Sequence, residues 1–209
     1  MKKNLLIAQS GGPTAAINAT VAGAVAQALL SEEVGVVYGA VNGIKGVMEE
    51  QIIDLGAQLA SPQALRLFSV TPAAGLGSCR LKLKDLEKDR EQFERILQVF
   101  EKYDVGYFIY VGGNDSMDTV AKLSRFVAGH GLEIKIMGAP KTVDNDLCGT
   151  DHTPGFGSAA KYVASTFAEL ARDVSVYNIK AVTIVEVMGR DAGWLTASAA
   201  AARQNGETK

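Results

Sequence analysis

Short apolar runs alternate along the chain with longer stretches in which apolar residues recur at helical spacing. This alternation is typical of βαβ units that fold into a largely parallel sheet, and it predicts an α/β fold. Because most of the runs are almost entirely apolar, we expect strands that are buried on both faces. The expected strands are residues 5–9, 36–40, 106–111, 134–138 and 182–187.

The stretches between these runs predict helices. Residues 16–30 are rich in alanine, and residues 85–103 place large apolar side chains along one side of a helix, which suits packing against a sheet. Those side chains are Leu86, Phe93, Ile96, Leu97 and Phe100. Further helices are expected over residues 116–128, 157–172 and 192–202. The length of 209 residues fits one large domain or two small lobes.

Composition narrows the function classes. The formal net charge is -2 with no long run of like charge, which does not favour nucleic-acid binding. The only cysteines are Cys79 and Cys148 and the only histidines are His130 and His152, so a structural zinc site is not expected. A disulfide stays open from sequence, but free thiols in a reducing compartment fit better. No apolar run approaches the ~20 residues of a membrane span, so we expect a cytoplasmic protein without a membrane partner.

Glycine-bearing turns occur where the expected strands end. They lie at residues 10–12, 112–113, 138–140 and 188–190. In open parallel sheets, ligands bind at the carboxyl ends of the strands. We therefore expect the four turns to build one site.

The first turn joins an expected strand to an expected helix. Gly11 and Gly12 allow a close approach of the backbone, and the N-terminus of the helix offers N–H groups to an anion. An ordinary βα turn without a ligand is the alternative. The chain contains neither the GxxxxGK[ST] phosphate loop nor the GxGxxG dinucleotide fingerprint, which argues against a nicotinamide-dependent dehydrogenase.

The second turn carries candidate metal ligands. Gly112 and Gly113 would admit a phosphate, Ser116 is expected to cap the next helix, and Asn114 and Asp115 offer oxygen ligands to Mg²⁺. The alternative is helix-capping chemistry that needs no metal.

The third turn is the strongest of the four signals. Lys141, Thr142, Asp144 and Asp146 follow an apolar strand directly, where they add little to packing. Phosphoryl transfer to a sugar hydroxyl needs a base, a cation near the moving group and a carboxylate that orders a metal. This loop can supply all three, although a merely solvated polar loop would also look charged.

Two further loops carry arginines. Arg190, beside Gly189, could hold a phosphate or sugar hydroxyls through its planar group, or it could pair with Asp191 or Glu186 on the surface. The glycine-rich loop that ends in Arg80 could also contact phosphates.

Five segments, taken together in this order, closely resemble the motifs of the phosphofructokinase family. They are residues 10–12, 77–80, 112–116, 141–146 and 187–190. The resemblance runs from about residue 5 to residue 202. It implies a Rossmann-like, mostly parallel sheet with helices on both faces, of the phosphofructokinase N-terminal type.

The resemblance also implies a role for individual residues. Asp144 matches the family's general base, which takes the proton from the 1-hydroxyl of fructose 6-phosphate to give fructose 1,6-bisphosphate. The positions that contact the sugar phosphate are Thr142, Val143, Asp144, Met188, Gly189 and Arg190. The positions near the donor phosphates are Gly11, Gly12, Arg80, Gly113 and Ser116. Asn114 and Asp146 match metal positions, so Mg²⁺ is the implied cofactor.

The choice of phosphoryl donor depends on Asp115 and Lys141. ATP-using members resemble GGDGS and carry a glycine in place of the lysine, whereas this chain follows the pyrophosphate pattern at both positions. Two unit charges ~4 Å apart repel by roughly 4 kcal/mol at an effective dielectric of ~20, so Asp115 would disfavour an ATP α-phosphate by about three decades. Lys141 would neutralise charge on the phosphate. An ATP-dependent member and a non-catalytic paralogue are the alternatives.

The chain departs from the family pattern at three points. Asn114 replaces an aspartate linked to Mg²⁺, and Ala181 beside Lys180 replaces an arginine that reaches the neighbouring subunit. Family members are also much longer and bring further sugar-phosphate ligands from a second domain. We therefore expect residues 1–209 to bind the donor and part of the acceptor and to turn over poorly. The full-length form is expected to be a homodimer or homotetramer.

Overall fold

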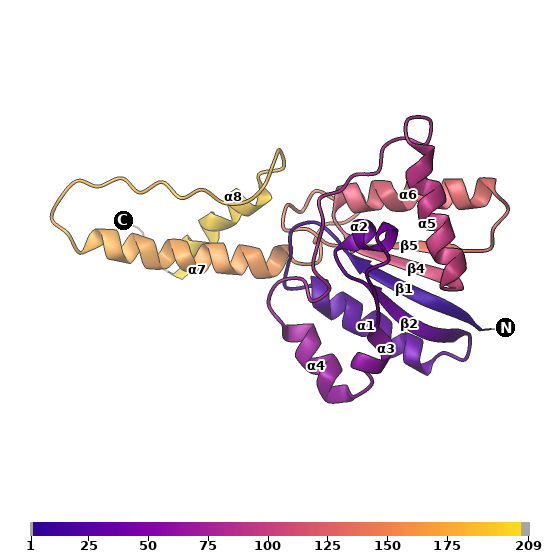
Figure 1. The fold of residues 1–209 in the computed structure, drawn as a ribbon. Helices are drawn as coiled ribbons and strands as arrows, with labels where there is room; N and C mark the ends of the chain where they lie inside the picture. The colour runs from indigo at the N-terminus through magenta and orange to yellow at the C-terminus, as the bar shows by residue number, and fades with distance from the viewer. Residues whose placement is uncertain (1, 206–209) are drawn as a thin grey trace. The chain divides into compact units, whose positions relative to one another are not determined.

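The computed structural model describes residues 2–205 and divides the chain into two compact units, Met1–Lys141 and Thr142–Lys209. The first unit contains a five-stranded sheet in the order β3-β2-β1-β4-β5 (Figure 1). All pairs are parallel except β2 with β3, which is antiparallel. The strands are β1 (Lys3–Gln9), β2 (Val34–Ala40), β3 (Ile52–Asp54), β4 (Val105–Gly112) and β5 (Lys135–Pro140).

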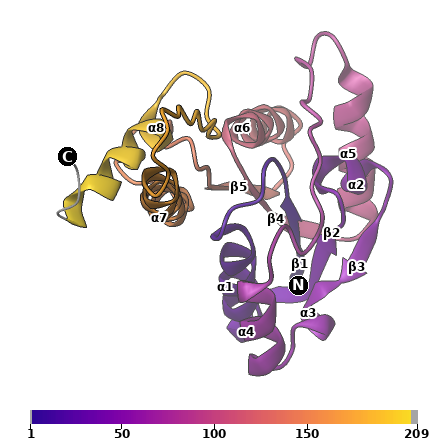
Figure 2. The same cartoon turned by 90° about the vertical axis from the view of Figure 1, so that its left-hand side faces the viewer.

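Helices cover both faces of this sheet, as Figure 2 shows. On one face lie α1 (Ile17–Leu30), α3 (Leu55–Gln58) and α4 (Pro62–Val70). On the other face lie α2 (Gly43–Met48), α5 (Arg90–Lys102) and α6 (Asn114–Gly129). The predicted α/β class with helices on both faces is confirmed.

Burial on both faces is found only for the central strands. Leu6 and Ile7 of β1 and Phe108 of β4 are fully buried, as their apolar runs predict. The same expectation is wrong for β5, where Met137 is 66% exposed. The reason is position, because β5 pairs with β4 alone and lies at the edge of the sheet.

The register of the sheet aligns the ends of three strands. Gln9 of β1 lies opposite Val111 of β4, and Gly112 lies opposite Pro140 of β5. The turns that follow β1 and β4 and the residue that follows β5 therefore begin at the same edge.

The second unit is built on α7 (Phe156–Ser175), α8 (Trp194–Ser198) and the 3₁₀ helix η1 (Ala199–Asn205). Its core contains Phe156, Val163 and Leu195, with Val143 and Val187 packed against them. The strand expected over residues 182–187 is wrong, because this extended segment forms no ladder with any other described segment. The turn at residues 188–190 therefore does not follow a strand. The turn expected at residues 138–140 is also wrong, because these residues pair with β4 and form the end of β5. Only the turns at residues 10–12 and 112–113 lie at the sheet edge as expected.

Several element boundaries also differ from expectation. The helix expected over residues 85–103 begins only at Arg90, so Leu86 lies outside it and is partly exposed. The helix expected over residues 192–202 is divided into α8 and η1. The elements α2, β3, α3 and α4 were not predicted.

Two expectations about the chain's chemistry can be compared with the structure. Cys79 and Cys148 are both free thiols, which confirms the preferred alternative. Among residues 2–205, no helix is both long and apolar enough to cross a bilayer.

Candidate active site

Three loops of the first unit meet at the side chain of Lys141. Its backbone N–H donates to the carbonyl of Gly112 at 2.9 Å, which continues the pairing of β4 with β5. Its ammonium donates to the carbonyl of Gly12 at 2.7 Å, although the residue is only 2% exposed. Gly11 has a φ of 76°, and a Cβ there would lie 3.1 Å from the Lys141 Nζ atom. The left-handed φ and the close ammonium together favour glycine in the turn after β1.

The loop that carries Arg80 packs against the same turn. The N–H of Gly11 donates to the carbonyl of Cys79 at 3.3 Å, and the Ser78 hydroxyl donates to the carbonyl of Gly11 at 2.6 Å. Arg80 is exposed beside these contacts. The structure therefore brings the predicted donor residues Gly11, Gly12 and Arg80 into neighbouring loops.

A buried pair of amide side chains holds the start of this loop in place. Gln9 and Asn18 are both fully enclosed, and the Gln9 Nε2 group donates to the Asn18 Oδ1 atom at 2.8 Å. Asn18 donates to the carbonyls of Thr71 and Ala73 and accepts from the N–H of Gly75. The path of residues 71–76 is therefore fixed by side chains from β1 and α1.

The turn after β4 begins α6. Gly113 occupies the N-cap position and no side chain caps the helix, so the expected capping role of Ser116 is wrong. Ser116 is instead buried in the first turn, where a Cβ on Gly112 would lie 2.0 Å from its hydroxyl oxygen. Glycine at 112 is what allows this close packing.

Asp115 lies in the first turn of α6 with its side chain 65% exposed. Its carboxylate is 3.2 Å from the ammonium of Lys82, which follows Arg80 closely in the chain. The carboxylate is therefore partly neutralised, and the repulsion expected toward ATP is smaller than for an isolated charge.

Cys79 and Tyr110 form a polar contact below these loops. Burial raises the pKa of the Cys79 thiol. Hydrogen bonds with the N–H groups of Lys45 and Leu81 and with the hydroxyls of Tyr110 and Ser10 lower it by more, so that the pKa is lowered overall. Burial raises the pKa of Tyr110, whose hydroxyl accepts from the N–H of Ile44. Tyr110 thus stays protonated while Cys79 is the more acidic of the two.

In the second unit, Arg190 lies close to two carboxylates. Its Nε atom is 3.8 Å from Asp144 and its Nη2 atom is 3.7 Å from Asp146. Within the described part of the chain, Arg190 forms no ion pair with Asp191 or Glu186, the alternative partners. The segments 141–146 and 187–190 are therefore adjacent, although they lie far apart in sequence. Both were expected to contact the sugar phosphate.

The residue between the two aspartates explains their common direction. Asn145 has a left-handed φ of 56° and points away, where its amide donates to the carbonyl of Asp151 and accepts from the N–H of Thr153. The Thr153 hydroxyl donates to the carbonyl of Thr142 at 2.8 Å, which closes the loop. This bracing holds Asp144 and Asp146 toward Arg190.

A cavity of about 140 Å³ lies at this cluster. Its lining includes the charged side chains of Asp144 and Arg190 and the aromatic ring of Trp194, at the start of α8. The lining residues are Asp144, Val187, Met188, Gly189, Arg190, Gly193, Trp194, Leu195 and Thr196.

The candidate metal ligands fall in different units. Asn114 begins α6 in the first unit, whereas Asp146 belongs to the second. Within residues 2–205, no group of three or more His, Cys, Asp or Glu side chains is arranged to hold a metal. Mg²⁺ in phosphoryl-transfer sites needs only one or two protein oxygens, since water and substrate phosphates complete its shell. The oxygens of Asn114 and the adjacent Asp115 fit that requirement.

Comparison with known proteins assigns the family. The phosphofructokinase family model matches residues 4–207, nearly the whole chain. The chain belongs to the phosphofructokinase family.

The relatives within this family include pyrophosphate users. The chain is 48% identical to a pyrophosphate–fructose 6-phosphate 1-phosphotransferase of Xanthomonas campestris, over 96% of this chain and 48% of that protein. It is 44% identical to the enzyme of the same name from Halomonas elongata, again over 96% of this chain and 48% of the relative. The chain thus spans about half the length of the curated relatives that it matches.

Solved structures agree with the assignment. A pyrophosphate-dependent phosphofructokinase from Nitrosospira multiformis superposes with a TM-score of 0.87 at 43% identity, over 94% of this chain and 48% of that one. The predicted fold type is therefore confirmed at the level of the family.

Some residues of this candidate site were missed from sequence. Lys82 was passed over, although it is a second cation next to Arg80. Asn145 was treated only as part of a polar loop, although asparagine is one of the non-glycine residues that most readily adopt a left-handed conformation. Thr153 was not considered. Trp194 had no polar signal, and only the cavity identifies it.

Proposed function

We propose that this phosphofructokinase polypeptide transfers a phosphoryl group from pyrophosphate to the 1-hydroxyl of fructose 6-phosphate, giving fructose 1,6-bisphosphate and phosphate reversibly. The observation that carries the proposal is Lys141, a buried lysine whose ammonium reaches the glycine turn after β1 while its backbone pairs with the turn after β4. The relatives from Xanthomonas campestris and Halomonas elongata are named for this reaction, which supports the proposal.

On the donor side, the first unit offers cations and backbone N–H groups together. Lys141 would neutralise charge on the phosphate, and Arg80 and Lys82 would add two exposed cations from the neighbouring loop. The glycines at 12 and 113 leave the backbone open to a phosphate, since a Cβ on Gly12 would meet nothing within 4 Å. Such a site suits a short polyphosphate.

Donor choice rests on Asp115. A carboxylate at an exposed site would repel an ATP α-phosphate ~4 Å away by about 1 to 4 kcal/mol, depending on the effective dielectric. Its 65% exposure and its pairing with Lys82 favour the lower half of that range. We therefore expect Asp115 to disfavour ATP by about 1 to 2 kcal/mol, which is about 5- to 30-fold in affinity.

On the acceptor side, the second unit offers a base and a cation. Asp144, with its side chain 15% exposed, would accept the proton of the 1-hydroxyl while the hydroxyl oxygen bonds to phosphorus and phosphate leaves. Arg190 would exchange its contacts with Asp144 and Asp146 for sugar-phosphate oxygens. Thr142 would stabilise the loop, since its hydroxyl accepts from the N–H of Asp144 at 3.1 Å.

Magnesium is the cofactor we propose. When bound, Mg²⁺ would shield the charge of the transferred phosphates. Asn114 and Asp115 are the residues of the first unit that would hold it, and Asp146 is the candidate of the second.

Donor binding tests the proposal. Calorimetric titration of the chain with magnesium pyrophosphate and with magnesium ATP should show tighter binding of pyrophosphate. In Asp115→Gly, ATP should bind about 5- to 30-fold more tightly than in the parent chain. An exposed aspartate of the same unit provides the matched control, so Asp54→Gly should leave the ratio of the two affinities unchanged.

Turnover provides a second readout. Any fructose 1,6-bisphosphate formed from pyrophosphate should disappear in Asp144→Asn, while pyrophosphate binding is retained. If ATP binds better than pyrophosphate, or if Asp144→Asn keeps full turnover, the proposal is wrong.

A further inference from the structure

One ion pair joins the segment after Arg80 to the first turn of α6. The ammonium of Lys82 lies 3.2 Å from the carboxylate of Asp115, and the two side chains are 59% and 65% exposed. Among residues 2–205, no other cation forms an ion pair with Asp115. The charge that Asp115 presents to a ligand therefore depends on Lys82.

The position of Lys82 is fixed by the residue that follows it. Leu83 is fully buried, and its carbonyl accepts a hydrogen bond from the ammonium of Lys122 at 3.0 Å. Lys122 is itself held by ion pairs of 2.8 Å with Asp118 and 3.1 Å with Asp85. An exposed ion pair usually contributes little, because two long side chains must be ordered. Here the backbone of Lys82 is already anchored, so only its side chain remains to be ordered.

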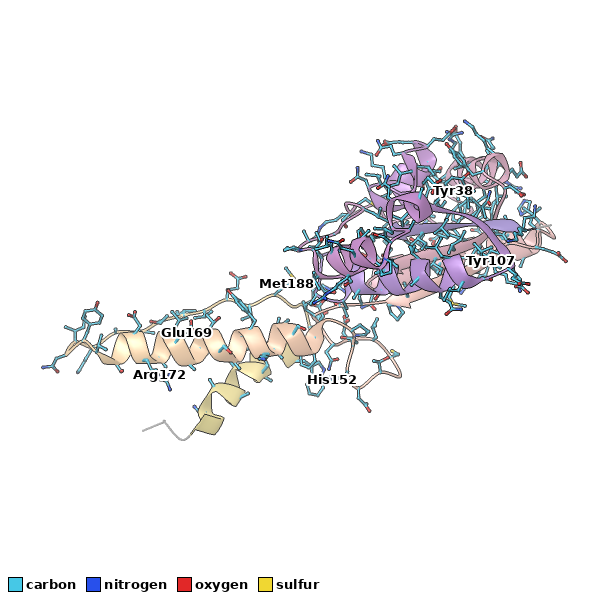
Figure 3. All side chains as sticks on the ribbon, turned by 90° about the horizontal axis from the view of Figure 1, so that it is seen from below. Tyr38, Tyr107, His152, Glu169, Arg172 and Met188 are labelled. Carbon is cyan, nitrogen blue, oxygen red and sulfur yellow. The ribbon has the colours of Figure 1, made fainter. Side chains whose placement is uncertain are left out.

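The ion pair belongs to the donor side of the candidate site. Asp115 lies in the helical turn that follows β4, and Lys82 follows the loop expected to contact the donor phosphates. Both residues are in the first unit, which carries Tyr38 and Tyr107 in Figure 3, whereas Met188, expected to contact the sugar phosphate, belongs to the second unit. A change in this ion pair should therefore act on the phosphoryl donor.

A lysine at this place acts on the two possible donors unequally. As a cation near the phosphates, Lys82 attracts pyrophosphate and ATP alike. As the partner of Asp115, it also weakens the repulsion that this carboxylate exerts on a negative group beside it. ATP would bring its α-phosphate to Asp115 and pyrophosphate would not, so this second effect favours ATP alone.

We propose that Lys82 is a specificity-determining residue for the phosphoryl donor, which limits the discrimination of Asp115 against ATP by pairing with its carboxylate. This inference rests on the proposed function, because it takes the donor phosphates to bind beside Asp115. Without the lysine, Asp115 is an isolated charge and repels ATP more strongly. The two residues therefore act as a unit, and the effect of changing one depends on the other.

A double-mutant cycle on donor affinity tests the proposal. Calorimetric titrations with magnesium pyrophosphate and with magnesium ATP are compared for the parent chain, Lys82→Met, Asp115→Asn and the double variant. Lys82→Met should weaken the binding of both donors, but that of ATP about 2- to 5-fold more, which is the range expected for an exposed ion pair. In the Asp115→Asn background, Lys82→Met should weaken both donors equally. An equal loss for both donors in the parent background, or an unequal loss of the same size in both backgrounds, overturns the proposal.

Two further variants separate the ion pair from the general effect of a lysine. Lys84 is 64% exposed and pairs with Asp89 at 3.3 Å, so Lys84→Met removes the same charge from the same segment and should leave the ratio of the two donor affinities unchanged. Lys82→Arg keeps the charge and should retain the ratio of the parent chain. The proposal is rejected if Lys84→Met changes the ratio as much as Lys82→Met does, or if Lys82→Arg behaves like Lys82→Met.

Ionic strength provides an independent measurement. The extra loss of ATP affinity in Lys82→Met should shrink between about 0.05 M and about 0.5 M KCl, because salt screens exposed charges. An undiminished loss would show that charge is not its cause and would overturn the proposal.

This outcome can be told apart from a failure of the proposed function. Tighter binding of ATP than of pyrophosphate by the parent chain rejects the proposed function, whereas the role of Lys82 is judged by the change between variants. A parent chain that binds neither donor rejects both.

Discussion

The buried amide of Asn18 should contribute more to stability than its size indicates. Asn18→Ala removes the partners of four groups, namely the Gln9 Nε2 group, the carbonyls of Thr71 and Ala73, and the N–H of Gly75. Each buried hydrogen bond contributes about 1 kcal/mol net, so the four together amount to about 3 to 4 kcal/mol. The Gln9 Nε2 group keeps its bond to the carbonyl of Ile17, and the Gln9 Oε1 atom still accepts from the N–H of Leu76, which places the expected loss at the lower end.

Urea-dependent hydrogen exchange of the β1 and β4 peptides measures the free energy of unfolding of the first unit. A matched control is Asn4→Ala, at the opposite end of β1, where the amide makes two hydrogen bonds, to Tyr103 and Val36. Asn4→Ala should lower the free energy of unfolding by about 1 to 2 kcal/mol. The reasoning is refuted if Asn18→Ala costs less than about 1 kcal/mol, or no more than the control. Water would then replace the amide without loss.

Two further predictions concern charged groups of the first unit. Lys141→Met keeps the apolar stem but removes the ammonium, and it should weaken pyrophosphate binding about 10- to 100-fold by calorimetry, with Lys45→Met, an exposed lysine, as the control. Unchanged affinity would exclude Lys141 from the donor site. Because the pKa of Cys79 is lowered from 9.0 in the folded chain, its thiolate stabilises the fold above the ordinary pKa, and this contribution is lost as the pH falls through the lowered value. In urea unfolding, Cys79→Ala should therefore lose more free energy of unfolding at pH 9.5 than at pH 6. An equal loss at the two pH values would contradict the lowered pKa of Cys79.

The first unit could be predicted from sequence because its signals are local. The apolar runs of β1 and β4 and the helical spacing in α5 and α6 report directly on which faces are buried. The short elements α3 and α4 were missed although their capping signals are present, since Asp54 and Ser61 each accept a hydrogen bond from the first turn. Short helices have too few residues for a periodic pattern, so only the caps could have identified them.

The second unit could be predicted less well, because its local structure depends on contacts with segments that are distant in sequence. The sequence of residues 182–187 favours a strand, but a strand forms only where a neighbouring backbone supplies hydrogen bonds. The same holds for individual side chains. The arginine at 190 could be placed in the candidate site by its motif, whereas its pairing with Asp144 and Asp146 depends on a loop conformation set by Asn145.

The single tryptophan and the acidic thiol lie in different units. Trp194 lines the cavity of the second unit, so its fluorescence should respond to an acceptor that enters there. Cys79 lies beneath the donor loops, so its rate of alkylation should report on their occupation once the exposed Cys148 is replaced by serine. The chain therefore carries one natural optical probe and one natural chemical probe, through which the two substrates can be followed separately in a single sample.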